Sequence, residues 1–282
     1  MRRAVRRFMP GETLDEALAA AAALAPERIG TILTCLGESL TEDPEADAVE
    51  AHYRDALDRI AAQGLVAEIS VKPTQLGLDL DRERCFGRLR RLLEHAAARD
   101  RYVWVDMEQS RYVDETLDLV RRGRQAFTGI GVALQAYLRR TPADLAAMLG
   151  AGIGVRLVKG AYDEPASVAF PDKKDVDAAY LELARTMLAR PDRAARAVFG
   201  THDDPIIEAI RAEAARAGTP AGSHEFHLLY GIRRPLQQAL AGGGEHVRVL
   251  ISYGEYWFPW YMRRLAERPA NVLFVLKSLV RS

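Results

Sequence analysis

Two adjacent arginines near the end of the sequence are the first candidates for chemistry. In the segment WYMRRLAERPAN, residues 260–271, Trp260 comes three and four positions before Arg263 and Arg264, so on a helix the three side chains share overlapping faces. Two guanidinium groups beside an aromatic ring could bind a carboxylate or a phosphate. The alternative is a surface helix on which Arg263 forms a weak exposed ion pair with Glu267. The helix pattern alone leaves both interpretations open.

Other polar residues that could do chemistry follow apolar, β-rich runs. Lys72 lies at the end of one run and could form a Schiff base or pair with a carboxylate. In RLVKGAY, Arg156 and Lys159 flank the end of another run, and the glycine that follows permits close backbone approach. This arrangement suits a pyrophosphate or an anionic cofactor. The alternative is that Lys159 only neutralises Asp163 or Glu164.

The elements that must position these residues alternate between short β-rich runs and longer helical patterns. Eight runs are predicted as strands: 31–37, 67–73, 102–108, 130–136, 154–160, 197–203, 224–230 and 247–254. A helical segment, GETLDEALAAAAALA, precedes the first strand, and its Thr13 is a predicted cap. Eight strand–helix units predict an α/β fold, a (βα)8 barrel of the TIM type, with an N-terminal helix and a C-terminal helix after strand eight. We expect one domain over residues 1–282.

A barrel of this type carries its functional side chains at the C-terminal ends of the strands or in the loops after them. The sequence places these polar residues at or after predicted strand ends: Lys72, Asp106, Gln135, Arg156, Lys159, Tyr162, Thr201, His202 and Asp203. A purely structural barrel has no reason to concentrate polar residues on one rim, so we expect the site there.

Composition excludes several classes of protein. Lys plus Arg and Asp plus Glu number 39 each among 282 residues, and this balance argues against a general nucleic-acid binder. Cys35 and Cys85 form no disulfide framework, which favours a reducing compartment. The sequence has no apolar run of the roughly 18 residues that span a bilayer, and its basic start lacks the apolar region of a secretory signal. We predict a cytoplasmic protein.

Motifs for other chemistries are missing or misplaced. The THD segment at 201–203 has no second histidine or carboxylate at ligand spacing, so no metal is predicted. GAGIG at 150–154 precedes a strand, whereas a dinucleotide-binding fingerprint follows one. Walker, G-x-S-x-G and H-E-x-x-H motifs are missing from the sequence. A nucleotide cofactor would therefore bind without a Rossmann domain.

Several segments together resemble the proline dehydrogenase family, FAD-dependent barrel enzymes that oxidise proline. The matching stretches, in the family's order, are ISVKPTQLGLDL, VDMEQS, VALQAY, RLVKGAY, AFPDK, THD, EFHLLYG and MRRLAERPANVLFVL. RLVKGAY followed by RRLAERPAN is the specific part. The resemblance implies a single-function bacterial type that oxidises L-proline to 1-pyrroline-5-carboxylate in proline catabolism. Hydride would pass to N5 of the flavin, and the electrons would then pass to a quinone.

The resemblance also implies a substrate site and catalytic residues. It makes Lys72, Arg263 and Arg264 the site for the substrate carboxylate, with Asp106 as the partner that holds Lys72. Arg156 would lie near the reactive edge of the isoalloxazine ring, and Asp106 and Arg156 are the residues assigned to catalysis.

For the cofactor, the resemblance places eight residues at flavin-contacting positions: Met107, Gln135, Arg156, Lys159, Gly160, Ala161, Thr201 and His202. Tyr162 and Glu225 are further candidates that would shape the cofactor pocket. The resemblance leaves open the oligomeric state and a peripheral contact with the inner membrane.

Three positions depart from the family pattern. Leu250 stands where strand eight usually presents a tyrosine, Ser252 replaces a proline, and Trp260 replaces a tyrosine one turn before the arginines. Each change touches the substrate wall. The chain is therefore either a divergent proline dehydrogenase with a repacked pocket or a flavin-dependent dehydrogenase of a related or larger cyclic imino acid.

Two hypotheses from other classes compete with a flavoenzyme. One is a cofactor-free barrel lyase that uses Lys72 or Lys159 as a Schiff base. The other is a non-catalytic barrel that binds an imino acid or a flavin as a sensor.

Overall fold

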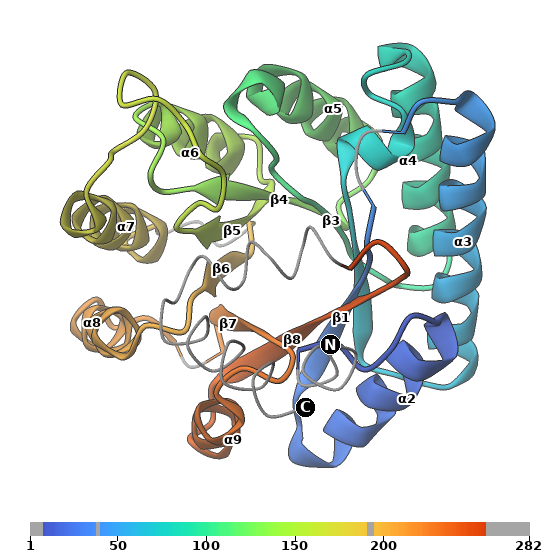
Figure 1. Cartoon of the computed structure of the whole chain (residues 1–282). Helices are drawn as coiled ribbons and strands as arrows, with labels where there is room; N and C mark the ends of the chain where they lie inside the picture. Colours follow the sequence, from blue (N-terminus) through green and yellow to red (C-terminus); the bar gives the residue numbers. More distant parts are fainter. Residues whose placement is uncertain (1–7, 38–39, 191–194, 221, 258–282) are drawn as a thin grey trace, which may run out of the picture.

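The computed structural model describes residues 8–37, 40–190, 195–220 and 222–257, which contain a closed barrel of eight parallel strands. The strands are β1 (Gly30–Cys35), β2 (Ala67–Val71), β3 (Val103–Val105), β4 (Ile130–Gln135), β5 (Gly154–Val158), β6 (Ala197–Gly200), β7 (His224–Leu229) and β8 (His246–Tyr253). Each pairs in parallel with its neighbours in sequence, and β8 closes the ring on β1. Figure 1 shows the strands around the centre and the helices outside them. The predicted barrel of the TIM type is confirmed.

The helices lie on the outside of the barrel, where α2 precedes β1 and the others connect successive strands (Figure 1). They are α2 (Leu14–Leu24), α3 (Asp43–Ala62), α4 (Arg82–Ala97), α5 (Val113–Ala126), α6 (Thr141–Gly150), α7 (Lys173–Leu188), α8 (Asp204–Arg216) and α9 (Arg234–Gly242), with short 3-10 turns η1 (Ala25–Glu27), η2 (Pro73–Leu76) and η3 (Ser110–Tyr112). The C-terminal helix predicted after strand eight lies outside the described residues. The prediction of one domain over the whole chain therefore remains a prediction.

The predicted N-terminal helix is α2, and its cap is the predicted one. The Thr13 hydroxyl accepts a hydrogen bond from the Glu16 amide at 3.2 Å, and the Glu16 carboxylate accepts one from the Thr13 amide at 3.0 Å. Such a reciprocal cap contributes roughly 1 kcal/mol to helix stability. The helix packs on β1 and β8, where the barrel closes.

The two faces of the strands have different neighbours because successive side chains point to opposite sides. Outward-facing residues such as Ile69, Val132 and Leu157 are fully buried in the main hydrophobic core. Inward-facing residues fall into three groups from the N-terminal to the C-terminal ends of the strands: the ionic layer (Glu68, Arg196, Glu225 and Arg248), the interior cluster (Ile32, Trp104 and Val198) and the mouth cluster (Ser70, Asp106 and Arg156). The mouth cluster is the part of the interior nearest the predicted site.

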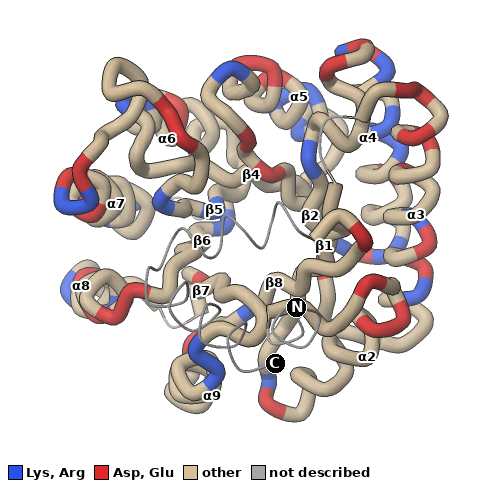
Figure 2. The backbone as a smooth tube through the Cα atoms, viewed as in Figure 1, with Lys and Arg blue, Asp and Glu red and all other residues tan. Residues whose placement is uncertain are grey.

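Charged residues of both signs are interspersed over the outer helices (Figure 2). The formal net charge of zero therefore does not arise from separate acidic and basic faces. Among the described helices, none combines the length and the apolar content that crossing a membrane requires.

Candidate active site

The strands bring four predicted site residues to the C-terminal mouth of the barrel. Lys72 comes directly after β2 and Asp106 directly after β3, while Gln135 ends β4 and Arg156 lies on β5. Their side chains are largely enclosed: the exposed fraction is 8% for Lys72, 3% for Gln135 and 5% for Arg156. Polar groups held in so little water can act strongly on a ligand at the mouth.

The mouth cluster joins β2, β3 and β5 through hydrogen bonds. Ser70 Oγ donates to Asp106 Oδ1 at 2.8 Å and accepts from Arg156 Nη2 at 3.0 Å. The same Nη2 also donates to Asp106 Oδ1, so the three groups form a closed triangle. Ser70 has no exposed surface. The triangle fixes the guanidinium of Arg156 from one side and leaves its other terminal nitrogen available.

Sequence reasoning missed Ser70. The signal was present, because Ser70 and Lys72 are two residues apart on β2 and its extension, and residues with that spacing face the same side of a strand. An inward-facing serine directly below a candidate lysine is a natural partner for the other charged groups of the mouth.

The expected pairing of Lys72 with Asp106 is wrong. Asp106 binds Arg156 and Ser70 instead. Within residues 8–257 as far as they are described, the Lys72 ammonium makes no hydrogen bond or ion pair. The structural reason is that Arg156 reaches Asp106 and Ser70 from β5 with one terminal nitrogen, Nη2, so that the Asp106 Oδ1 atom is already bonded twice.

Arg156 is a buried cation. Burial lowers the pKa of its guanidinium, and the neighbouring Asp106 carboxylate opposes that effect. An arginine nevertheless stays protonated at physiological pH. Its Cζ lies 5.2 Å from the centroid of the Trp104 ring, a cation–π contact that supports the group from the interior. The mouth therefore holds a fixed positive charge.

The buried polar atoms of the mouth that have no hydrogen-bond partner among the described residues include Arg156 Nη1, a donor, and Gln135 Oε1, an acceptor. They belong to adjacent strands, since Ala133 of β4 pairs with Arg156 of β5. Native proteins rarely leave such atoms unsatisfied without a functional reason. A planar ring with both acceptors and donors along its edge, as in an isoalloxazine, would satisfy both. The residues present therefore fit a flavin.

The end of β5 differs from expectation in its ion pairs. Lys159 Nζ donates to Asp203 Oδ2 at 2.8 Å and also binds Asp177, so it does not neutralise Asp163 or Glu164. Glu164 instead accepts two hydrogen bonds of 2.6 Å from Ser110. Burial alone would raise the pKa of the Asp203 carboxyl, but hydrogen bonds and charge from Lys159 hold that pKa below its ordinary value.

Gly160 makes room for a neighbouring ring. Its φ is +122°, in the region that side chains rarely adopt. A Cβ at this position would lie 2.3 Å from Cδ1 of Tyr137. Tyr137 is anchored there because its amide donates to the Lys159 carbonyl at 2.9 Å. The next residue, Ala161, is exposed.

The THD segment joins the ends of β6 and β7. Thr201 is buried, and its hydroxyl accepts from the Asp203 amide at 3.2 Å. His202 Nε2 accepts from the Leu229 amide at 2.9 Å, which places the ring proton of a neutral imidazole on Nδ1. The His202 carbonyl accepts from Arg233 at 2.8 Å. These bonds hold the loop after β6 in one conformation.

The remaining predicted residues fall in three places. Met107 is buried after β3, and its carbonyl accepts from Gln135 Nε2 at 3.5 Å. Leu250 is half-buried on β8 and packs against the interior cluster. Trp260, Arg263 and Arg264 lie outside the described residues.

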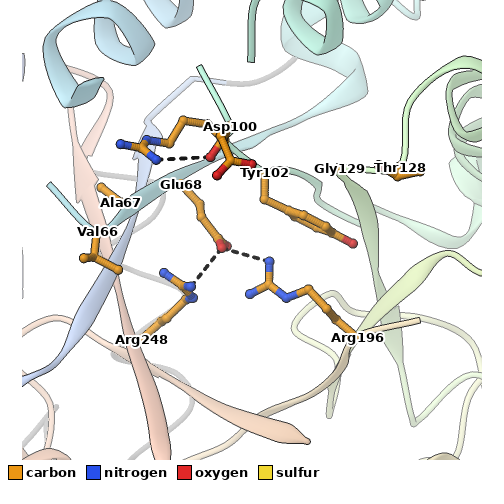
Figure 3. A pocket seen from close by; sticks show the side chains of 10 residues that line it. Val66, Ala67, Glu68, Asp100, Tyr102, Thr128, Gly129, Arg196 and Arg248 are labelled. Atoms are coloured by element: carbon orange, nitrogen blue, oxygen red, sulfur yellow. Dashed lines mark hydrogen bonds and ion pairs between the residues drawn. The ribbon is translucent and has the colours of Figure 1, made fainter. Parts of the chain in front are cut away.

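A pocket of about 430 Å³ opens at the opposite, N-terminal end of the barrel, where Glu68, Arg196 and Arg248 line it (Figure 3). Glu68 Oε1 binds Arg196 at 2.8 Å and Arg248 at 3.1 Å. Since Glu68 pairs with both arginines, and catalytic groups of such barrels lie at the C-terminal face, we assign this pocket a structural role.

Glu225 belongs to the ionic layer, and the expectation that it shapes the cofactor pocket is wrong. It accepts from Arg196 Nε at 2.8 Å and from Arg248 Nε at 3.0 Å. Its position explains this, because the second residue of β7 lies near the N-terminal end of the strand. Tyr162, its companion candidate, lies in the loop after β5, beside Ala161.

Comparisons with known proteins agree with this architecture. The sequence model of the family "Proline dehydrogenase" matches residues 17–277. Proline dehydrogenase 1 of Bacillus subtilis subsp. natto is 39% identical over 276 residues, 98% of this chain and 90% of that protein. Proline dehydrogenase of Deinococcus radiodurans is 33% identical over 280 residues, 98% of this chain and 89% of the relative.

Solved structures with the same fold include proline utilization A (PutA) from Bdellovibrio bacteriovorus inactivated by N-propargylglycine. The TM-score is 0.87 at 23% identity, and the match covers 93% of this chain and 32% of that longer chain. The barrel, the family and the enzyme class predicted from the sequence are thus confirmed: this chain belongs to the proline dehydrogenase family.

Proposed function

We propose that this chain oxidises L-proline to 1-pyrroline-5-carboxylate with bound FAD and passes the electrons to a quinone. The proline dehydrogenase family is flavin-dependent, and its relatives named proline dehydrogenase share most of their length with this chain. The observation that carries the proposal is the pair of buried polar atoms at the mouth, Arg156 Nη1 and Gln135 Oε1, which lack partners in the described part of the chain.

The residues that would hold the cofactor come from four successive strand ends: Met107, Gln135, Arg156, Lys159, Gly160, Ala161, Thr201 and His202. FAD supplies the two-electron oxidant that this reaction needs. Arg156 keeps a fixed positive charge where negative charge develops, and such preorganised charge is worth about 2.7–4 kcal/mol per donor. Ser70 and Asp106 hold its guanidinium in place.

The substrate carboxylate would be bound by Lys72, Arg263 and Arg264. Arginine side chains bind carboxylates through two parallel hydrogen bonds, which fixes orientation as well as affinity. Anchoring the carboxylate holds the proline ring in one orientation at the mouth, so the reaction gains from positioning. The nearby cations also favour the neutral form of the ring amine, the form that can be oxidised.

The first experiment is the anaerobic visible absorption spectrum of the purified protein before and after addition of L-proline. We expect the spectrum of an oxidised flavin, which bleaches when proline is added. Bleaching that a quinone analogue then reverses would support the acceptor. A protein that takes up no flavin, even after incubation with FAD, would contradict the proposal. Sedimentation with vesicles tests the peripheral membrane contact that a quinone acceptor implies.

A second candidate substrate is a related or larger cyclic imino acid. The observation that favours it is Leu250, a half-buried aliphatic side chain inside the barrel where the resemblance predicts a tyrosine. A smaller side chain leaves more room at the substrate wall. A flavin that stays oxidised with L-proline but bleaches with a six-membered imino acid would support this candidate.

The Schiff-base lyase has less support. Lys159 is held in ion pairs by Asp177 and Asp203, and an ion-paired ammonium is a poor nucleophile. Borohydride trapping of a substrate carbonyl on Lys72 would favour the lyase. Tight binding of an imino acid without reduction of an electron acceptor would favour the sensor.

A further inference from the structure

The interior cluster lies directly below the mouth of the barrel and is separate from the main hydrophobic core. Trp104 stands two residues before Asp106 on the inward face of β3. It has an exposed fraction of 0%, while Leu250 packs against the cluster and is only half-buried. Leu250 thus rests on a cluster whose largest side chain is Trp104.

The Trp104 ring cannot move easily. Its Nε1 donates to Glu68 Oε2 at 2.7 Å, which ties the indole to the ionic layer. On the neighbouring strand, Gly131 leaves room for the ring, since a Cβ there would lie 2.5 Å from Cζ3 of Trp104. From the mouth side, the Arg156 guanidinium lies over the ring. The largest side chain of the interior is therefore fixed on three sides.

We propose that Trp104 is a positioning residue that supports Leu250 and so limits the size of the imino acid accepted at the mouth. The inference rests on the proposed function, because it concerns the substrate of that same site. The argument is one of volume. Protein interiors are close-packed, so a larger side chain at position 250 would compete with Trp104 for the same space, and a smaller one at position 104 would let Leu250 recede.

The test is a double-mutant cycle with Trp104→Leu, Leu250→Tyr and the two combined. The measured quantity is the ratio of kcat/KM for L-proline to that for L-pipecolate, the six-membered homologue. Trp104→Leu should lower this ratio about tenfold or more, because one methylene in an apolar pocket changes specificity by at least that factor. Leu250→Tyr should lower kcat/KM for both substrates, and adding Trp104→Leu should restore part of that loss, because the smaller side chain at position 104 makes room for the tyrosine.

Two further variants separate this role from a merely structural one. Val105→Ala is the matched control, because Val105 lies on the same strand, is 1% exposed and faces the main core. It should lower the melting temperature without moving the ratio. If Trp104→Leu does not fold, Trp104→Met is a milder replacement, since methionine fills irregular gaps, and the same direction is expected.

The outcomes distinguish this inference from the proposed function. An unchanged chain that oxidises neither acid overturns the proposed function, and the inference with it. The inference alone is overturned if the chain oxidises proline but substitution at Trp104 leaves the ratio of the two kcat/KM values unchanged. It is also overturned if Trp104→Leu and Leu250→Tyr act independently.

Discussion

The Ser70 hydroxyl lies 3.0 Å from Nη2 of Arg156, a residue 86 positions further along the chain. The same hydroxyl donates to Asp106, so one small side chain joins both charged groups of the mouth cluster. A buried ion pair is costly unless its remaining donors and acceptors are satisfied. Ser70 supplies that satisfaction on one side of the guanidinium, and this leaves Nη1 free to act on a ligand.

Replacing Ser70 with alanine should therefore weaken both stability and activity. A hydrogen bond to a charged group contributes roughly 1.5–3 kcal/mol, so the free energy of unfolding should fall by about this amount. The rate of flavin reduction should fall as well, because Arg156 is less well oriented. Thr116→Val is the matched control, since its buried hydroxyl has no partner in the described structure. Stability is measured by denaturant titration and flavin reduction by stopped-flow absorbance. If the two substitutions have equal effects in both measurements, Ser70 does not orient Arg156.

Arg156→Lys tests whether Nη1 of the Arg156 guanidinium takes part in the reaction. Lysine keeps a positive charge beside Asp106 but offers a single point donor instead of a fork. We expect the rate constant for flavin reduction at saturating L-proline to fall by about 10²–10³, the usual cost of removing one preorganised donor. Arg185→Lys, at a half-exposed position on α7, serves as the control. A variant as active as this control would show that Nη1 does not take part.

Gly160→Ala should reduce the flavin content of the purified protein. The new Cβ would collide with the Tyr137 ring, so either the ring or the backbone beside the mouth must shift. Gly64→Ala is the control, because Gly64 also has a positive φ, +63°, but nothing lies within 4 Å of an added Cβ. Backbone strain alone should lower stability in both variants. If the flavin absorbance per protein falls equally in the two variants, the loss is due to backbone strain and not to the collision with Tyr137.

The sequence was sufficient to predict the barrel because apolar runs of strand length alternate with helical periodicity along it. The prediction from the sequence placed the C-terminal ends of some strands too far along the chain. The run 102–108 was predicted as a strand, but β3 ends at Val105. The polar residues that follow an apolar run belong to the mouth, where the pleat stops, and pattern alone does not mark that change.

Partners across the barrel could not be predicted in the same way. Asp106 meets Arg156 because β3, β4 and β5 pair in a particular register, and that register is a property of the closed sheet. Lys159 likewise meets Asp177 of α7, although Asp163 and Glu164 are closer in sequence. Glu225 was a different case, because its place near the start of a predicted strand already indicated the N-terminal end of the barrel.

Arg264→Met tests the proposed substrate clamp, which rests on the resemblance and lies outside the described residues. Loss of a charge-assisted hydrogen bond to the carboxylate, about 1.5–3 kcal/mol, should raise the KM for L-proline roughly ten- to hundredfold. Flavin content should stay near that of the unchanged protein. Arg211→Met on α8, where the side chain is 42% exposed, is the control. A variant that loses flavin but keeps its KM would mean that Arg264 serves the cofactor.

His227→Gln should make stability less dependent on pH. Burial lowers the pKa of His227 to about 3, since it outweighs the opposing hydrogen bond and charge of Glu225, and the charges of Arg156 and Arg196 add to the lowering. The folded protein therefore keeps the ring neutral. The unfolded chain binds a proton near the ordinary value of 6.5. Between these values the unfolded state holds more protons, so stability falls as pH falls, by up to about 1.4 kcal/mol per pH unit.

Glutamine cannot titrate, so the variant should lose this part of the slope. The comparison is best made by denaturant unfolding above pH 4.5, the ordinary pKa of a glutamate, because the Glu225 carboxyl is then mostly ionised in the unfolded chain as well as in the folded one. Between pH 4.5 and 6.5 the free energy of unfolding should fall with decreasing pH in the unchanged protein and remain flatter in the variant. Parallel curves would mean that His227 is protonated in the folded barrel. The ring would then carry a third positive charge beside Arg156 and Arg196.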